Sequence, residues 1–109
     1  MRDLTVLMTT YNNAEYLSAS IKSILNQTYK NFDFLIIDDG STDNSKDIIE
    51  EFKDERIKYL KIENSGLGAA LNYGLKLTET ELIVRMDADD ISLPDRITKQ
   101  YDFISKNKN

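Results

Sequence analysis

Glu81-Leu-Ile-Val-Arg-Met-Asp87-Ala-Asp89-Asp90 is the stretch that decides the fold. Its apolar run predicts a short buried strand over residues 82–86, and this strand leads directly into three carboxylates. Carboxylates placed so closely repel one another unless a cation lies between them. Oxygen ligands on a rigid strand end suit Mg²⁺ or Mn²⁺, which leave coordination positions open to substrate phosphates. We therefore predict that Asp87 and Asp89 hold a divalent metal ion, and that this metal holds a nucleoside diphosphate.

The composition limits the chemistry that the rest of the chain can perform. The 109 residues suffice for one small domain with one core. The formal net charge is −5 and no stretch is densely basic, so we expect no nucleic-acid partner. The chain has no Cys and no His, so any acid–base work falls to carboxylates, Tyr or Lys.

No apolar run approaches the length that spans a membrane, and residues 1–6 read as the start of a strand rather than as a signal peptide. We therefore expect a cytoplasmic domain. Peripheral attachment to the inner face of the membrane is the alternative for a longer protein.

Apolar runs and helical spacing alternate along the chain. They predict strands over residues 4–9, 34–37, 56–62 and 82–86, the third at a sheet edge because Lys occupies its exposed positions. They predict helices over residues 14–27, after a cap at Ser41 or Thr42, over residues 69–77, and from Ser92 onward. Four strand–helix units in a row predict an α/β domain with a Rossmann-like, four-stranded, mainly parallel sheet and helices on both faces.

The last two predicted helices carry expectations about burial. In the helix over residues 69–77, the side expected to face inward consists of Ala70, Leu71, Gly74 and Leu75. In the helix from Ser92 onward, the residues that keep helical spacing are Leu93, Ile97, Tyr101 and Ile104.

Polar clusters follow all four predicted strands. They occupy residues 9–12, 38–40, 63–68 and 87–90. Ligands of parallel α/β sheets bind beyond the carboxyl ends of the strands, which lie at one edge. The sequence therefore predicts one site that all four clusters share.

Each cluster also has a reading without function. Asp87 and Asp89 could form a turn and cap a helix, and Asp38 or Asp39 could cap the helix that follows. Tyr11 could be a core or rim aromatic, or could stack on a nucleobase. One of the two aspartates after the second strand could instead accept a hydrogen bond from a base imide N–H, which selects uracil or thymine over cytosine.

Three motifs that bind ions or nucleotides do not fit. An EF-hand counted from Asp87 would need Gly and Glu where Ser92 and Thr98 stand. The glycines at 66 and 68 do not meet the dinucleotide fingerprint, and no P-loop pattern exists.

Together the motifs resemble those of the family 2 glycosyltransferases, which have the GT-A fold. The matching stretches are Val6-Leu-Met-Thr-Thr-Tyr-Asn12, Ile36-Ile-Asp-Asp-Gly-Ser-Thr-Asp43, Asn64-x-Gly-Leu-Gly-x-Ala-x-Asn72-x-Gly74 and Arg85-Met-Asp-Ala-Asp-Asp-Ile-Ser-Leu-Pro-Asp-Arg96. They stand in the family's order and cover nearly the whole chain.

The resemblance assigns roles to the nucleotide-sugar side of the site. Thr9 and Tyr11 would contact the uracil or the ribose, with Tyr11 stacked on the base. Asp39 would pair with the uracil ring, and Asp38 would support the same turn. Asn72 would lie on the helix that borders the donor. One departure is that Leu71 stands where many members of the family have Arg.

The resemblance also assigns the metal. Asp89 would be the direct ligand of Mn²⁺ or Mg²⁺, and Asp87 would serve the same motif while facing the ribose or the donor sugar. The implied activity is metal-assisted transfer of a sugar from a UDP-type donor to a hydroxyl of a saccharide or lipid-linked acceptor, with inversion.

The family's domain normally continues for roughly another hundred residues, with an acceptor site and a carboxylate base that this chain does not match. We therefore expect residues 1–109 to form a single domain that is the N-terminal, donor-binding half of a GT-A transferase. A nucleotide-sugar-binding module without turnover is the alternative. An assembly module that forms homodimers through uncovered surfaces is another. A phosphatase or response-regulator-like domain is disfavoured because its key Asp would end the first strand.

Overall fold

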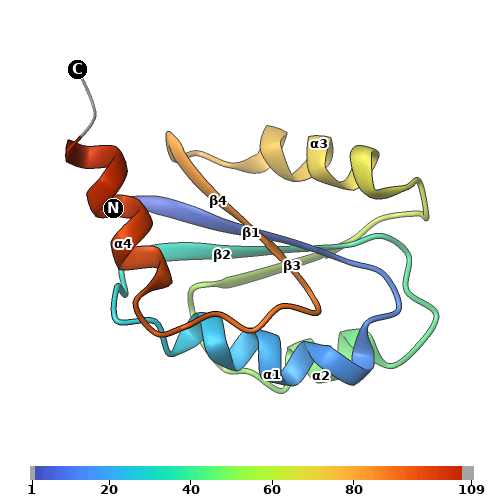
Figure 1. The fold of residues 1–109 in the computed structure, drawn as a ribbon. Coiled ribbons are helices and arrows are strands. Elements are labelled where there is room, and N and C mark those ends of the chain that lie inside the picture. Colours follow the sequence, from blue (N-terminus) through green and yellow to red (C-terminus); the bar gives the residue numbers. More distant parts are fainter. Residues whose placement is uncertain (1, 107–109) are drawn as a thin grey trace.

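The computed structural model describes residues 2–106 and has four strand–helix pairs (Figure 1). The elements are β1 (Leu4–Thr10), α1 (Ala14–Leu25), β2 (Phe32–Asp38), α2 (Ser45–Glu50), β3 (Ile57–Lys61), α3 (Leu67–Leu77), β4 (Leu82–Asp87) and α4 (Arg96–Lys106). The predicted alternation of strands and helices is confirmed, with bounds that differ by a few residues.

The four strands form one parallel sheet in the order β3-β2-β1-β4. The edge position predicted for the third strand is confirmed. Thr9 pairs in register with Ile37 of β2 and with Asp87 of β4, so the carboxyl ends of the three strands are level. The loops that follow the strands therefore emerge side by side.

The sheet is covered on both faces, as predicted, with α1 and α2 below it and α3 above it in Figure 1. The lower core is built from strand residues such as Val6, Met8 and Phe34, together with Ile21 of α1 and Ile49 of α2. Burial of such apolar side chains supplies most of the driving force for folding.

The upper core is smaller, and Ala70 of α3 packs there against Leu7 and Ile37. A Cβ added at Gly74 would lie 2.6 Å from a methyl carbon of Leu7, so glycine lets α3 approach the sheet. The inward placement of Ala70 and Gly74 is confirmed. Leu75 is 46% exposed, so its expected inward position is wrong.

The expected cap at Ser41 or Thr42 is also wrong, because α2 begins at Ser45 after Asn44. Both residues are engaged elsewhere. The Ser41 hydroxyl accepts the backbone N–H of Asn12 over 2.9 Å, and the N–H of Thr42 donates to Asn12 Oδ1 over 2.8 Å. These bonds join the loops after β1 and β2 instead of opening a helix.

The last helix begins at Arg96, not at Ser92 as expected. Leu93 precedes the helix and is 73% exposed, whereas Ile97 is fully buried and Tyr101 is half-buried. The side chain of Ile104 lies outside the described part. The segment before Arg96 is held away from helical geometry because Ser92, Leu93 and Pro94 form hydrogen bonds with α1 and the turn after it.

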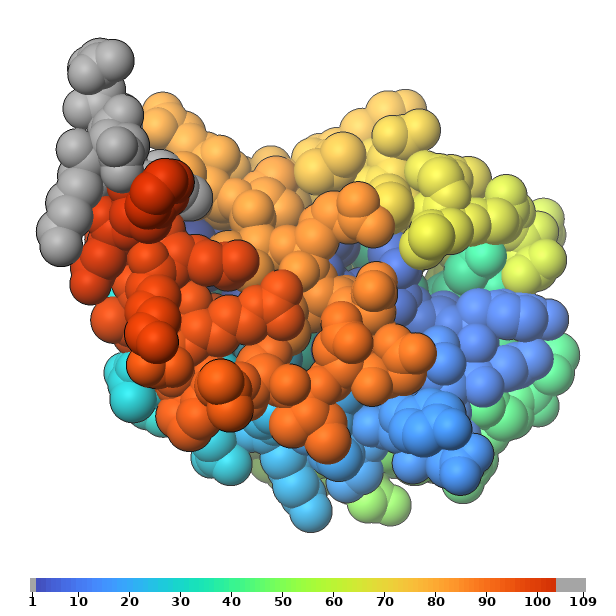
Figure 2. Space-filling view, in the orientation of Figure 1, coloured from blue at the N-terminus to red at the C-terminus, as the bar shows by residue number. Residues whose placement is uncertain are grey.

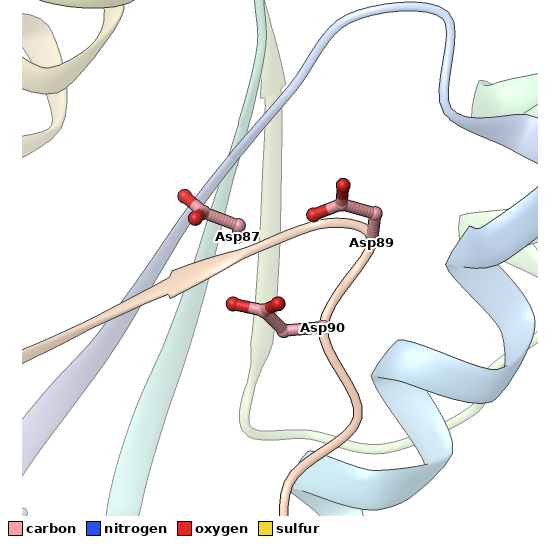
Figure 3. A group of neighbouring side chains, drawn as sticks. All are labelled: Asp87, Asp89 and Asp90. Atoms are coloured by element: carbon pink, nitrogen blue, oxygen red, sulfur yellow. The ribbon is translucent and has the colours of Figure 1, made fainter.

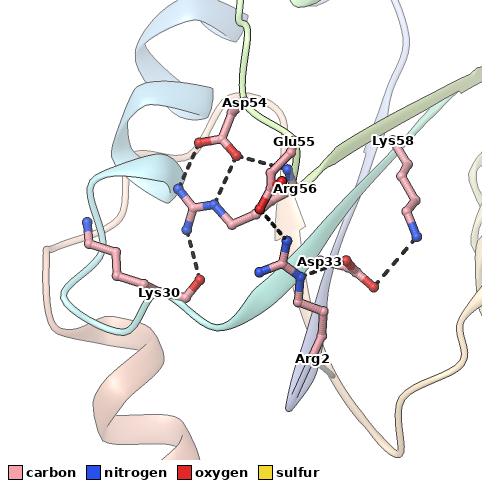
Figure 4. A network of polar contacts seen from close by, with 7 residues as sticks. All are labelled: Arg2, Lys30, Asp33, Asp54, Glu55, Arg56 and Lys58. Carbon is pink, nitrogen blue, oxygen red and sulfur yellow. Dashed lines mark hydrogen bonds and ion pairs between the residues drawn. The ribbon is translucent and has the colours of Figure 1, made fainter.

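A polar network stabilises the amino-terminal end of the sheet, far from the loops that follow the strands (Figure 4). The Arg56 guanidinium donates to both carboxylate oxygens of Asp54 and to the carbonyl oxygens of Leu25 and Lys30. Its central carbon lies 4.6 Å from the centre of the Phe32 ring. One side chain therefore joins the end of α1, the start of β2 and the turn before β3.

None of the described helices combines the length and the apolar composition that crossing a membrane would require.

Candidate functional site

The loops after the strands border an open cavity of about 500 Å³ at the carboxyl edge of the sheet. This volume lies within the range usual for small-molecule sites. Its lining comes from all four strand–helix connections: Thr9, Thr10, Tyr11, Asn13, Asp39, Asn64, Gly66, Leu67, Ala70, Asp87, Ala88 and Asp89. In Figure 2 the orange end of β4, the yellow start of α3 and the blue loop after β1 meet around a hollow. One cavity thus joins Tyr11, Asp39 and Asp89.

The β1 side of the cavity carries an exposed aromatic ring. Tyr11 is 47% exposed and lines the cavity, so it is not a core aromatic, and its position suits a rim aromatic as well as a ring that stacks on a base. Its backbone N–H donates to Asn13 Oδ1 over 3.1 Å, which fixes the turn that presents the ring. Thr9, the last but one residue of β1, is 8% exposed and lines the wall beside it.

Asp39 follows β2 and is held by the loop that opens α3. Its Oδ1 accepts the N–H of Ser65 over 2.8 Å, and its Oδ2 accepts the N–H of Gly66 over 3.0 Å. An ionised carboxylate offers about four acceptor positions, so these bonds leave capacity for a ligand. Asp39 therefore shapes one loop and borders the cavity, and it does not cap α2.

Asp38 lies outside the cavity lining. Its side chain is fully buried, with Oδ1 accepting the N–H of Ser41 over 2.9 Å and Oδ2 accepting the hydroxyl of Tyr59 over 2.7 Å. Burial, together with this bond to a carboxylate, raises the pKa of Tyr59 well above its usual range. Asp38 supports the turn beneath the site and is not among the residues that line the cavity.

Asn72 is exposed on α3 and does not line the cavity either. Of the six residues that the sequence assigned to the nucleotide sugar, the cavity brings together Thr9, Tyr11, Asp39 and Asp87.

The end of β4 carries three exposed aspartates. Oxygen atoms of Asp87, Asp89 and Asp90 lie within 4.8 Å of one another, and Figure 3 shows the three carboxylates gathered at the strand end, with Asp87 and Asp89 above the ribbon and Asp90 below it. Asp87 and Asp89 also line the cavity. The turn that was the alternative reading is present too, since the N–H of Asp90 donates to the carbonyl oxygen of Asp87 over 3.1 Å. The turn and the cluster therefore exist together.

Asn12 and Asn64 are structural parts of the site to which the sequence had assigned no role. Asn12 has φ 52 and links the loops after β1 and β2 through its backbone and its side chain. Asn64 lines the cavity, and its amide donates to the carbonyl oxygen of Asp39 over 2.9 Å. Gly40 fits closely against it, because a Cβ there would lie 2.7 Å from the Asn64 nitrogen. Asparagine is a typical residue of the turns that follow strands, and this is the signal that could have identified these positions.

Residues 5–109 match the family model described as glycosyl transferase family 2. The chain belongs to this family. Among the relatives of this family 2 chain is an uncharacterized glycosyltransferase of Methanocaldococcus jannaschii, which is 42% identical over 110 residues. That match covers 96% of this chain and 38% of the relative.

Solved glycosyltransferase structures share the fold of this family 2 chain. Staphylococcus aureus TarS 1–349 in complex with UDP-GlcNAc superposes with a TM-score of 0.89 at 28% identity, over 97% of this chain and 32% of TarS. The mannosyltransferase PcManGT of Pyrobaculum calidifontis, in complex with GDP-Man and Mn²⁺, has a TM-score of 0.87 at 24% identity, over 96% of this chain and 33% of that protein. The predicted GT-A fold is confirmed. The chain spans about a third of the length of these structures.

Proposed function

We propose that this chain forms the donor-binding half of a glycosyltransferase that uses a UDP-type sugar donor. One observation carries the proposal: a single cavity is lined by the Tyr11 ring, the Asp39 carboxylate and the carboxylates of Asp87 and Asp89. Family membership and the likeness to TarS, which was solved with UDP-GlcNAc, support the same donor class.

The two ends of the cavity suit the two ends of a nucleoside diphosphate. At one end the exposed Tyr11 ring would stack on the base, and Asp39 would accept the imide N–H of uracil. Cytosine has no imide N–H, so a carboxylate acceptor favours uracil over it. At the other end lie Asp87 and Asp89, and the diphosphate would extend toward them along Thr9.

The acidic residues at the end of β4 fit a divalent cation. They offer oxygen ligands only, from carboxylates close enough together for one ion, and oxygen donors are what Mn²⁺ and Mg²⁺ prefer. We propose Asp89 as the direct ligand and Asp87 as the second residue of the motif. When bound, the ion would act as a Lewis acid that neutralises charge on the departing diphosphate.

The proposed reaction is attack of an acceptor hydroxyl on the anomeric carbon of the donor sugar, from the face opposite the diphosphate, with inversion. A base would remove the hydroxyl proton. We propose a saccharide or lipid-linked acceptor, and we place the acceptor site and the base in a further half of a longer protein. This chain's own part is to hold the nucleobase, the ribose and the diphosphate of the donor.

Calorimetry with UDP tests the donor site. Mn²⁺ should strengthen UDP binding to the wild-type chain, and Asp89→Asn should remove that gain because the ion loses its ligand. Asp102→Asn removes the same charge from the exposed side of α4 and should bind UDP like the wild type. Equal UDP binding by the wild type and Asp89→Asn in Mn²⁺ would refute the metal role. A transfer assay with a panel of UDP-sugars then separates a transferase from a binding module without turnover.

A further inference from the structure

The segment between β4 and α4, residues 88–95, contains neither helix nor strand. Ile91 and Leu93 in this segment are 72% and 73% exposed, so burial of its large apolar side chains does not fix its path. Two of the three clustered aspartates, Asp89 and Asp90, belong to it. The position of these carboxylates therefore depends on what else holds the segment.

Polar groups of α1 and of the turn after it hold the segment at several points. The Ser20 hydroxyl, which is fully buried, donates to the carbonyl oxygen of Asp87 over 3.4 Å. The Ser23 hydroxyl accepts the N–H of Ser92 over 3.0 Å, and it donates to the carbonyl oxygen of Ser20 over 2.7 Å. These contacts lie on both sides of Asp89 and Asp90 in the sequence.

Gln27 completes the set. Its side chain is fully buried, and both ends of its amide are used. Nε2 donates to the carbonyl oxygen of Leu93 over 2.6 Å, and Oε1 accepts the N–H of Ile97 over 2.9 Å. An amide that satisfies one acceptor and one donor at fixed positions sets both the path and the register of the chain.

We propose that Ser20, Ser23 and Gln27, here called the α1 clamp, are positioning residues that hold Asp87, Asp89 and Asp90 in the arrangement that binds the cation. The inference rests on the proposed function. Loss of a group that hydrogen-bonds to metal ligands and orients them typically lowers metal affinity about 10- to 100-fold. The α1 clamp would support the metal ligands through the backbone. It bonds the carbonyl oxygen of Asp87 and the N–H of Ser92, which lie on either side of Asp89 and Asp90 in the sequence.

The alternative is that these residues only anchor α4 and stabilise the fold. The two roles differ in which part of UDP binding they affect. A general loss of structure would weaken contacts at Tyr11 and Asp39 as well, and so would lower UDP affinity without metal. A shift of the three aspartates at the end of β4 alone lowers the affinity for Mn²⁺ and the gain that Mn²⁺ gives to UDP binding. It leaves UDP binding without metal unchanged.

Ser23 offers the sharpest test because it is half-buried and small changes are tolerated there more readily than at Gln27. Ser23→Ala removes the acceptor for the Ser92 N–H, whereas Ser23→Thr keeps a hydroxyl at the same position. Ser18→Ala is the matched control, since Ser18 is half-buried on the same helix and contributes none of these hydrogen bonds. Binding of Mn²⁺ alone is followed by electron paramagnetic resonance, and UDP binding by calorimetry with Mn²⁺ and with EDTA.

In Ser23→Ala we expect about tenfold weaker Mn²⁺ binding, unchanged UDP binding in EDTA, and faster hydrogen exchange of the Ser92 amide without metal. Ser23→Thr should restore Mn²⁺ affinity to within about twofold of the wild type. Wild-type Mn²⁺ affinity in Ser23→Ala, or equal losses in Mn²⁺ and in EDTA, would overturn the α1 clamp and leave the proposed function intact. If Mn²⁺ gives no gain in UDP binding to the wild-type chain, the proposed function itself fails.

Discussion

Asp39 accepts the backbone N–H of Gly66 over 3.0 Å and so ties the end of β2 to the start of α3. Gly66 has φ 97, a conformation that glycine adopts without strain, and this turns its N–H toward the carboxylate. The same carboxylate borders the cavity beside Gly66. A single side chain thus shapes the loop and is available to the ligand, which means that its replacement should affect both.

Asp39→Asn should weaken UDP binding about tenfold or more. An amide has one acceptor oxygen, whereas two N–H groups, from Ser65 and Gly66, point at the carboxylate. One of them would then face an NH₂ group and lose its partner. We expect the loss to be equal with Mn²⁺ and with EDTA, because Asp39 lies at the base end of the proposed site. Calorimetry measures both. A loss confined to Mn²⁺ would contradict this assignment, and Asp47→Asn on the exposed side of α2 is the charge control.

Gly40→Ala should destabilise the fold by about 1–3 kcal/mol. Gly40 has φ 79, and a Cβ there would lie 2.7 Å from the backbone nitrogen of Asn64, so the two loops would have to separate. Gly68→Ala is the matched control, because a Cβ at Gly68 meets no atom within 4 Å and the residue is helical. The free energy of unfolding of Gly68→Ala should equal that of the wild type or be slightly higher. Urea unfolding compares the two, and equal free energies of unfolding would refute the close contact.

Two replacements of Tyr11 should distinguish the contribution of its ring to UDP binding from that of its hydroxyl. Stacking needs the aromatic face, so Tyr11→Phe should bind UDP as the wild type does, and Tyr11→Ala should bind it about tenfold more weakly. The ring is 47% exposed, so neither variant should change the free energy of unfolding much. Tyr16→Ala removes an equally exposed ring (49%) from α1 outside the cavity lining and serves as the control in calorimetry. A loss of UDP affinity in Tyr16→Ala of the same size would argue against stacking at Tyr11.

Local patterns predicted the strands, the helices and the shared edge because apolar runs and helical spacing are properties of neighbouring residues. They failed where a distant residue decides. Ser41 and Thr42 do not open a helix because both form hydrogen bonds with Asn12, some thirty positions earlier in the sequence. Ser92 does not open the last helix, which begins at Arg96, and its N–H is bonded to Ser23, 69 positions away.

Within the site, the position of Tyr11 and the acidic tip followed from strand ends alone. The support given by Asn64 and by the α1 clamp could not be predicted, because such contacts become visible only when the chain is folded.

Arg56→Lys should lower the free energy of unfolding by about 1–3 kcal/mol. The guanidinium serves Leu25, Lys30 and Asp54 at once, from a side chain that is 11% exposed. An ammonium carries its three N–H donors on one nitrogen and cannot reach all three groups. Lys58→Ala is the comparison, since its pair with Asp33 spans 3.7 Å and Lys58 is 62% exposed, which should make the loss less than about 1 kcal/mol. Urea unfolding measures both variants. UDP binding should survive in each, because the network lies at the far end of the sheet.

The carboxylate in the same network should give the fold an acid-sensitive contribution. The hydrogen bonds from Arg56 hold the pKa of Asp54 below its ordinary value of 3.8. A carboxyl whose pKa is lower in the folded state than in the unfolded state stabilises the fold above the unfolded pKa, and this contribution is lost as the pH falls through the folded one. Asp54→Asn should therefore reduce stability at pH 7 and bring the variant closer to the wild type as the pH drops below 3.8. Urea unfolding between pH 7 and a pH below 3.8 measures the free energy of unfolding of both proteins, with Asp47→Asn as the control. A difference between wild type and Asp54→Asn that stayed constant over this pH range would contradict the assignment.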